Sequence, residues 1–338
     1  MVCMTTAFNS SLSSPRLGEQ VRLTATRYLP VKSNEHGMTL LFFHCAGSHK
    51  EVWEPTIRYI LMADACRGRG PLVREAWSFD MPNHGEAAYL NRELLERLKR
   101  PFTVEDFADI LRVFFASGNL AGHRLIAIGH SLGATAMLLA TLPDILPPPP
   151  YAAVLMVEPA LISPECYKSS PDIQALLEDT AKGVLKRRDT WPSREQAKEY
   201  FRKRFPWNNW DSRVLDLYVV HALREVEPKE GLSRSTEVTL CCTKAQESHA
   251  YAYHAPHFRT VELFRSGMDP SLPVHWIMGE HDDLAPKHVH ESVMKLRPVV
   301  STRAVPDAGH FVVQENPDGL GAAILEVLVL AAVPKANL

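Results

Sequence analysis

The sequence has little that would direct the chain to nucleic acid, to an oxidising compartment or to a disulfide framework. Its 37 basic and 39 acidic residues give a formal net charge of −2, so we expect no electrostatic attraction to nucleic acid. The six cysteines are scattered without a CxxC pair, and no secretory apolar segment follows Met1. This pattern favours reduced cysteines and an intracellular location.

Long hydrophobic runs, internal repeats and extended low-complexity segments are also absent. The most apolar stretch, residues 322–333, is interrupted by Glu326 and is too short to cross a bilayer. It predicts a buried amphipathic helix rather than a transmembrane segment. The only low-complexity tract is the four-proline run 147–150, which is typical of a stiff connection.

What the chain does have is enough length and apolar content for a large core. Of its 338 residues, 46% are hydrophobic and 22% are charged, as in an ordinary globular protein. One α/β domain of roughly 200–250 residues would leave about a hundred residues for an insertion.

Short apolar runs that stop at polar clusters alternate with helical patterns along most of the chain. After a flexible leader over residues 1–20, the runs predict strands at 21–28, 39–44, 76–80, 125–129, 153–158, 274–278 and 302–305. The clearest helix is 103–115, where Thr103 and Asp106 form a capping-box start. Strands that alternate with helices predict an α/β fold with a mostly parallel sheet flanked by helices.

The alternation stops after residue 160 and returns near residue 271. The intervening sequence is helical, charged and aromatic. We therefore expect a core formed by residues 21–160 and 271–338, with a helical cap domain over residues 161–270. A final helix is expected to begin at Pro317.

Ser131 is the predicted nucleophile. It lies at the centre of Gly129-His130-Ser131-Leu132-Gly133, directly after an apolar strand and before a helix-forming segment. At such a turn the serine is held in a strained backbone conformation that exposes its hydroxyl, and the flanking glycines avoid collisions. The following helix directs its N-terminal amides at the same point, which favours developing negative charge.

A serine nucleophile requires a general base and a carboxylate that orients it. His310 is the predicted base because it follows the strand 302–305 on a loop beyond the last strand. Asp282, just past the strand 274–278, is the preferred acid. Glu158, which ends the strand 153–158, is the alternative acid because it could reach the same histidine.

The loop 44–48 follows a buried strand and contains small residues that let a backbone amide approach the substrate. The amides of Leu132 and Ala46, with Cys45 as the alternative to Ala46, are the predicted oxyanion hole. We expect His44 to brace this loop. The substrate-pocket candidates are His44, His130, Trp207, Trp210, Tyr251, Tyr253 and His254.

These residues predict acylation of Ser131 by an ester or thioester of a hydrophobic small molecule, followed by hydrolysis, with neither metal nor cofactor. Two alternatives stay open. The same residues could perform acyl transfer, carbon–carbon bond hydrolysis or cyclisation, or the chain could be a non-catalytic small-molecule binding protein. The oligomeric state is not predicted.

Five ordered motifs resemble the α/β-hydrolase superfamily: His44-Cys45-Ala46-Gly47, the segment from Asp80 to Glu86, the Ser131 turn, Gly279-x-x-Asp282 and Gly309-His310-Phe311. The resemblance implies an eight-stranded sheet, a cap after the sixth strand and the chain order serine, acid, histidine. More narrowly, the loop 44–55 with Val157-Glu158-Pro159 is similar to fungal toxin-biosynthesis and peroxisomal lipase-like hydrolases. It departs from them at Cys45-Ala46.

The C-terminal residues Ala336-Asn337-Leu338 resemble a variant peroxisomal targeting signal. The resemblance implies a peroxisomal import receptor as a partner. Without a working signal, we expect the protein to be cytoplasmic.

Overall fold

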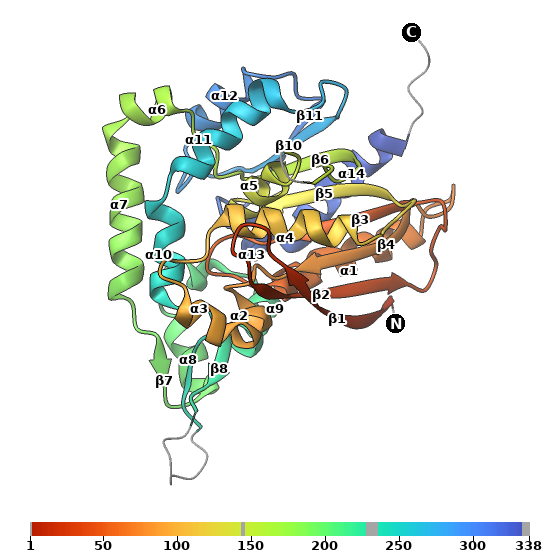
Figure 1. Ribbon diagram of the computed structural model, residues 1–338. Coiled ribbons are helices and arrows are strands. Elements are labelled where there is room, and N and C mark those ends of the chain that lie inside the picture. Colours follow the sequence, from red (N-terminus) through yellow and green to blue (C-terminus); the bar gives the residue numbers. More distant parts are fainter. Residues whose placement is uncertain (1, 143–145, 228–235, 333–338) are drawn as a thin grey trace.

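The fold is built on one large mixed sheet, as the computed structural model shows for residues 2–142, 146–227 and 236–332 (Figure 1). Eight strands lie in the order β1-β2-β4-β3-β5-β6-β10-β11. Their bounds are β1 Cys3–Ser13, β2 Gln20–Pro30, β3 Met38–Phe43, β4 Val73–Phe79, β5 Arg124–His130, β6 Tyr151–Val157, β10 Val274–Gly279 and β11 Ser301–Val305. Every strand expected from an apolar run is therefore present, within a few residues of its predicted bounds.

The six strands from β4 to β11 pair in parallel, whereas β1 and β2 add to the edge in antiparallel fashion. The central strands are buried along their length, because helices cover both faces of the sheet. The predicted α/β fold with a mostly parallel sheet is confirmed.

The expectation of a flexible leader over residues 1–20 is wrong. Residues 3–13 form β1, which pairs with β2 from Cys3 opposite Pro30 to Ser13 opposite Gln20. The strand is rich in Ser and Thr because most of it is exposed at the sheet edge. Phe8 nevertheless packs edge-on against Trp77 and Phe114, and this tertiary contact was not visible in the local pattern.

Helices cover the two faces of the sheet and connect its strands (Figure 1). α1 and α14 pack on one face and α4 and α5 on the other. α4 begins with the predicted Thr103–Asp106 capping box, and α14 begins at Pro317 as expected. The helices of the main domain are α1 Glu54–Ala65, α2 Gly85–Leu90, α3 Arg92–Arg97, α4 Val104–Ala116, α5 Leu132–Leu139, α12 Lys287–Met294, α13 Val312–Glu315 and α14 Pro317–Ala332.

The segment between β6 and β10 holds further helices and a small sheet of its own. The helices are α6 Pro164–Ser169, α7 Pro171–Lys186, α8 Arg194–Phe201, α9 Ser212–His221, α10 Lys244–Ala252 and α11 Ala255–Glu262. The small antiparallel sheet has the order β7 (Thr190–Trp191), β9 (Val238–Leu240) and β8 (Leu223–Glu225). The segment has a separate aromatic core that includes Trp191, Phe201 and Tyr218. We call this segment the cap. Its small sheet was not predicted, because strands of two or three residues leave no periodic pattern.

The carboxyl ends of the parallel strands meet at one edge of the sheet, where the loops after β3, β5, β6, β10 and β11 come together. This edge is where ligands bind in open α/β sheets. Within the described ranges, no helix is long and apolar enough to span a membrane. Residues 336–338, the predicted targeting signal, lie outside the described residues.

Candidate active site

Ser131 occupies the sharp turn between β5 and α5. Its backbone φ is 51° and ψ is −116°, a conformation that side-chain-bearing residues rarely adopt. A Cβ added to Gly129 would lie 2.6 Å from the Ala134 backbone, and one added to Gly133 would lie 2.3 Å from the Phe43 carbonyl oxygen. The glycines are therefore required by close backbone packing. The strain is typical of a turn that presents a functional side chain.

His310 lies on the loop between β11 and α13, within hydrogen-bonding distance of the serine. Its Nε2 is 3.1 Å from Ser131 Oγ. Its Nδ1 is 3.3 Å from Oε2 of Glu158. The serine and the histidine thus meet as the sequence predicted, although 179 residues separate them.

Glu158, the alternative acid, is the carboxylate that contacts His310. It follows β6 with φ of +41°, is buried, and accepts the backbone N–H of Gly279 at 2.7 Å through Oε1. Burial alone would raise the pKa of Glu158, but hydrogen bonds from His290 and His310 outweigh burial and lower the pKa to about 2. The carboxylate is therefore charged at neutral pH.

The preference for Asp282 as the orienting acid is corrected by this geometry. Asp282 is exposed, and its Oδ1 accepts the backbone N–H of Lys287 at the first turn of α12. Its neighbour Asp283 accepts the backbone N–H of His310 at 2.9 Å. Both aspartates follow β10, but the turn directs their carboxylates at backbone amides instead of the imidazole.

His130 holds the backbone of the candidate base and is not part of the pocket wall. Its Nε2 lies 2.8 Å from the His310 carbonyl oxygen, which can only accept, so Nε2 carries the proton. Burial, together with the nearby His310, lowers the pKa of His130 to about 3, so the ring is neutral. The expectation that His130 lines the pocket is wrong because the ring is buried beneath His310.

The loop after β3 is held by two further neutral histidines. His44 donates through Nδ1 to the Cys45 carbonyl at 2.7 Å and accepts the Met81 N–H through Nε2 at 3.0 Å. His84 accepts the Gly47 N–H through Nε2 at 2.9 Å. Burial lowers the pKa of His44 to about 4 and that of His84 well below 6.5. His44 therefore braces the loop, as predicted, but does not line the pocket.

Ala46 lies between these two anchored neighbours. Within the described chain, the backbone N–H groups of Ala46 and Leu132 have no protein acceptor, and both residues line the cavity that contains Ser131. Leu132 is the first residue of α5, whose first-turn amides have no partner inside the helix. The arrangement can offer two amides to one oxyanion. Burial raises the pKa of the Cys45 thiol to about 12, so Cys45 is not a thiolate nucleophile.

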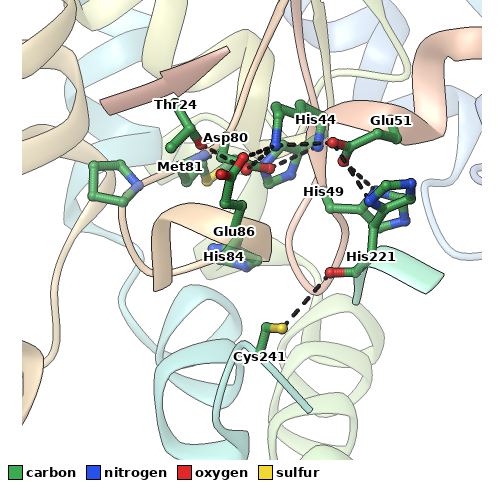
Figure 2. A network of polar contacts seen from close by, with 12 residues as sticks. Thr24, His44, His49, Glu51, Asp80, Met81, His84, Glu86, His221 and Cys241 are labelled. Carbon is green, nitrogen blue, oxygen red and sulfur yellow. Dashed lines mark hydrogen bonds and ion pairs between the residues drawn. The ribbon is translucent and has the colours of Figure 1, made fainter. Parts of the chain in front are cut away.

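A buried ionic network behind the loop explains the segment from Asp80 to Glu86 (Figure 2). Lys50 Nζ contacts Asp80 at 3.0 Å, Glu51 at 2.9 Å and Glu86 at 2.9 Å. Burial alone would lower the pKa of Lys50, but the carboxylates of Asp80 and Glu51 outweigh burial and raise it. Asp80 also accepts the Lys50 backbone N–H at 2.8 Å. These residues hold the loop, and none of them lines the cavity that contains Ser131.

Comparison with known proteins identifies the family of the chain. The family model described as "Alpha/beta hydrolase family" matches residues 40–323. The chain belongs to the alpha/beta hydrolase family. The hydrolase is 25% identical over 222 residues to "Abhydrolase domain-containing protein AKT2" from Alternaria alternata, a match that covers 57% of this chain and 78% of the relative.

A second relative is similar in both sequence and structure. "Peroxisomal membrane protein LPX1" of Saccharomyces cerevisiae is 27% identical over 190 residues, which cover 53% of this chain but only 46% of the yeast protein. The solved structure of that peroxisomal alpha-beta-hydrolase has a TM-score of 0.73 at 18% identity, and the alignment covers 99% of this chain and 92% of the yeast chain. The thioesterase domain from the curacin biosynthetic pathway has a TM-score of 0.62 at 15% identity and covers 96% of this chain and 99% of its own. These similarities show the fold.

A cavity of about 660 Å³ lies under the cap of the hydrolase and is open to Ser131, Leu132, Ala46 and His310. Its volume is in the range of small-molecule sites. The cap supplies mostly apolar walls, including Ile173, Leu176, Leu177, Val184, Phe205 and Pro206. Of the predicted pocket residues, Trp207, Trp210, Tyr251 and His254 line the cavity. Tyr253 does not, because its hydroxyl lies 3.3 Å from Glu105 on the α4 side.

The sequence analysis missed a buried ion pair in the cavity wall. Arg187, at the end of α7, forms a two-pronged contact with Glu247 of α10. The Glu247 carboxylate lies where a side chain at Gly47 would be, 2.7 Å from an ideal Cβ. No sequence signal could have paired these residues, which lie 60 positions apart. The pair places a polar corner of the cap directly against the loop after β3.

Proposed function

We propose that the protein is a serine hydrolase that cleaves an ester or thioester of a hydrophobic small molecule through an acyl-serine intermediate. The observation that carries the proposal is a pair of hydrogen-bond contacts made by His310 beside an apolar cavity. Its Nε2 lies 3.1 Å from Ser131 Oγ, and its Nδ1 lies 3.3 Å from Glu158 Oε2. A hydroxyl, an imidazole and a charged carboxylate in this order supply nucleophile, general base and orienting group.

In the first step, His310 Nε2 takes the proton of Ser131 as Oγ attacks the acyl carbon. Glu158 holds Nδ1–H and stabilises the imidazolium that forms. The acyl oxygen, on which negative charge develops, would accept hydrogen bonds from the N–H groups of Leu132 and Ala46. His310 then gives its proton to the leaving oxygen or sulfur, which leaves Ser131 acylated.

In the second step, water occupies the place of the leaving group. His310 takes its proton, the hydroxide adds to the acyl carbon, and collapse of the tetrahedral intermediate returns the proton to Ser131 and releases the acid. The apolar cap wall favours an acyl or alcohol portion without charge.

Covalent labelling with a fluorophosphonate probe tests the nucleophile. We expect the wild type to be labelled and Ser131→Ala to lose all labelling. Ser11→Ala, on the exposed edge strand β1, serves as the matched control and should label normally. Undiminished labelling of Ser131→Ala would overturn the proposal.

Steady-state assays of acyl esters against acyl-thioesters, with product analysis by mass spectrometry, then test the reaction class. Release of the free acid supports hydrolysis. Recovery of a new ester or of a cyclic product would instead assign acyl transfer or cyclisation to the same site.

We also propose that the protein is imported into peroxisomes through Ala336-Asn337-Leu338. The proposal rests on the resemblance of these residues to a targeting signal and on the name of the yeast relative. A fluorescent protein fused ahead of the last residues should form peroxisomal puncta, and removal of the tripeptide should disperse them. Cytosolic fluorescence of the intact fusion would contradict the proposal.

A further inference from the structure

A second buried imidazole contacts the carboxylate of the proposed triad. His290, on α12, lies with Nε2 3.2 Å from Glu158 Oε2, the same oxygen that His310 Nδ1 approaches at 3.3 Å. His290 is 1% exposed and packs edge-on against Trp276 at 5.8 Å. The two histidines therefore converge on one carboxylate oxygen from different elements.

The contact with Glu158 accounts for the placement of His290. Among the described residues, His290 Nδ1 is buried and has no hydrogen-bond partner, so the ring makes one polar contact, through Nε2. A carboxylate only accepts, so Nε2 carries the proton and donates it. A buried ring nitrogen without a partner costs free energy, so the single bond to Glu158 is the one polar interaction that favours a histidine at this position.

The hydrogen-bond partners of Glu158 contain no lysine or arginine within the described chain. Oε1 accepts the Gly279 N–H, and Oε2 accepts from the two imidazoles. The negative charge of this buried carboxylate is thus compensated by one amide and two rings. Since both rings donate to Oε2, the hydrogen bond from one ring weakens the attraction between Oε2 and the other ring.

We propose that His290 is a positioning residue of the active site, which fixes the Glu158 carboxylate and shares its negative charge with His310. The inference rests on the proposed function and extends the triad by one residue. His290 lies in the wall of the cavity, but its one polar contact among the described residues is with Glu158. We therefore assign its effect on the reaction to Glu158.

The direction of the effect follows from electrostatics. Without the His290 donor, the whole negative charge of Oε2 faces His310, which stabilises the imidazolium more strongly. A larger fraction of the variant than of the wild type would then hold a protonated, inactive base. The acidic limb of the kcat/KM profile would therefore move to higher pH.

The other titratable groups near His310 form hydrogen bonds with backbone atoms of His310 or of its neighbour Gly309. His130 donates to the His310 carbonyl, Asp283 accepts the His310 N–H, and Glu315 accepts the Gly309 N–H. These three groups are left unchanged in the test, so they form a constant background for the two imidazoles on Glu158.

The experiment compares His290→Leu, His290→Gln and His288→Gln in the full chain. Leucine removes the donor and fills the space, whereas glutamine retains an N–H that can reach Glu158. His288 lies on the exposed face of the same helix and is the matched control. Active sites are counted by fluorophosphonate labelling, so that misfolded protein does not enter the rates. The readout is the pH dependence of kcat/KM for a p-nitrophenyl ester.

We expect His290→Leu to move the acidic limb of the kcat/KM profile upward by about one pH unit, which lowers kcat/KM about tenfold on that limb. His290→Gln should restore most of the profile, and His288→Gln should match the wild type. An unshifted limb in His290→Leu would overturn the inference, even if the protein is less stable. A shifted limb in both Leu and Gln variants would also overturn it, because the donated hydrogen bond would then be irrelevant.

Failure of the proposed function gives a different result. If Ser131→Ala still reacts with the probe, or if Glu158→Gln is fully active, the triad itself is wrong. If those variants are inactive while the His290 variants keep the wild-type pH profile, only the role of His290 is wrong.

Discussion

The end of the sheet and the cap form opposite walls of one cavity, and they are held by different kinds of interaction. At the sheet, Ser131, Glu158 and His310 are fixed by strained turns and by hydrogen bonds between side chains and backbone amides. In the cap, apolar side chains of α7 line the cavity, and two of them, Leu176 and Leu177, are only partly buried. The difference indicates that the sheet end determines the chemistry and that the cap determines which substrates fit.

The two regions meet at the loop after β3. Gln246 of α10 accepts hydrogen bonds from Phe102 N–H and from the side chain of Asn83, which in turn contacts His84. The next residue, Glu247, lies against Gly47. One turn of a cap helix therefore reaches both the loop and the histidine that braces it. Substitutions at this junction and on either side of it test whether the sheet end and the cap have separate roles.

The largest effect is expected for the acid at the sheet end. Glu158→Gln keeps the shape of the side chain but removes the charge that stabilises imidazolium, so we expect kcat to fall about 10³–10⁴-fold. Asp282→Asn changes the exposed carboxylate that the sequence favoured as the acid, and it should leave kcat unchanged. Stopped-flow or steady-state kinetics on active-site-titrated protein decides between them. A loss of kcat confined to Asp282→Asn would instead assign the role of the acid to Asp282.

The next effect is expected where the cap touches the loop. Gly47 has φ of +70°, and an added Cβ would collide with Glu247, which Arg187 holds in place. Gly47→Ala should displace the Ala46 amide and lower kcat about 10²-fold, the effect of one lost oxyanion donor. Gly18→Ala carries the same backbone strain at φ of +67°, with no atom within 4 Å, and is the control. Equal activity of both variants would show that the junction is not needed for catalysis.

Acid should weaken the sheet-end region through its neutral histidines. His44 and His84 have pKa values below 6.5 in the folded protein, so only the unfolded chain takes up their protons between pH 6.5 and about 4. The free energy of unfolding should therefore have its full value above pH 6.5. Below that pH it should decrease by up to about 1.4 kcal/mol per pH unit for each histidine. Urea titrations at pH 7.0 and 5.5 measure the slope. His44→Gln should flatten it, and an unchanged slope would mean that His44 is already protonated.

The smallest effect is expected in the cap wall and should depend on the substrate. Leu176 lines the cavity, so Leu176→Ala should lower kcat/KM for a long-chain ester about tenfold by removing apolar contact, with little change for an acetyl ester. Leu185 lies exposed on the same helix, and Leu185→Ala is the control. A similar loss for both esters would indicate that the cap also shapes the catalytic step.

The strands of the sheet could be predicted because buried parallel strands read as continuous apolar runs that end in polar residues. β1 could not, since an exposed edge strand of Ser and Thr has no apolar pattern and forms through its pairing with β2. The cap sheet and the Arg187–Glu247 pair depend on contacts between distant segments, which local sequence does not record. Trp207, Trp210 and Tyr251 line the cavity as predicted. Tyr253, which directly follows the helix that carries Tyr251, does not, because its hydroxyl lies next to Glu105 of α4.

The sequence by itself determined the parallel sheet, the strained turn at Ser131 and the loop that carries His310, because each has a local signature: an apolar run, a glycine pair or a position after a strand. The sequence favoured Asp282 over Glu158 as the acid, although both carboxylates follow strands of the same sheet. Only the tertiary structure decided between them. The left-handed turn after β6 and the amide of Gly279 direct Glu158 at His310, and these depend on how neighbouring strands are aligned.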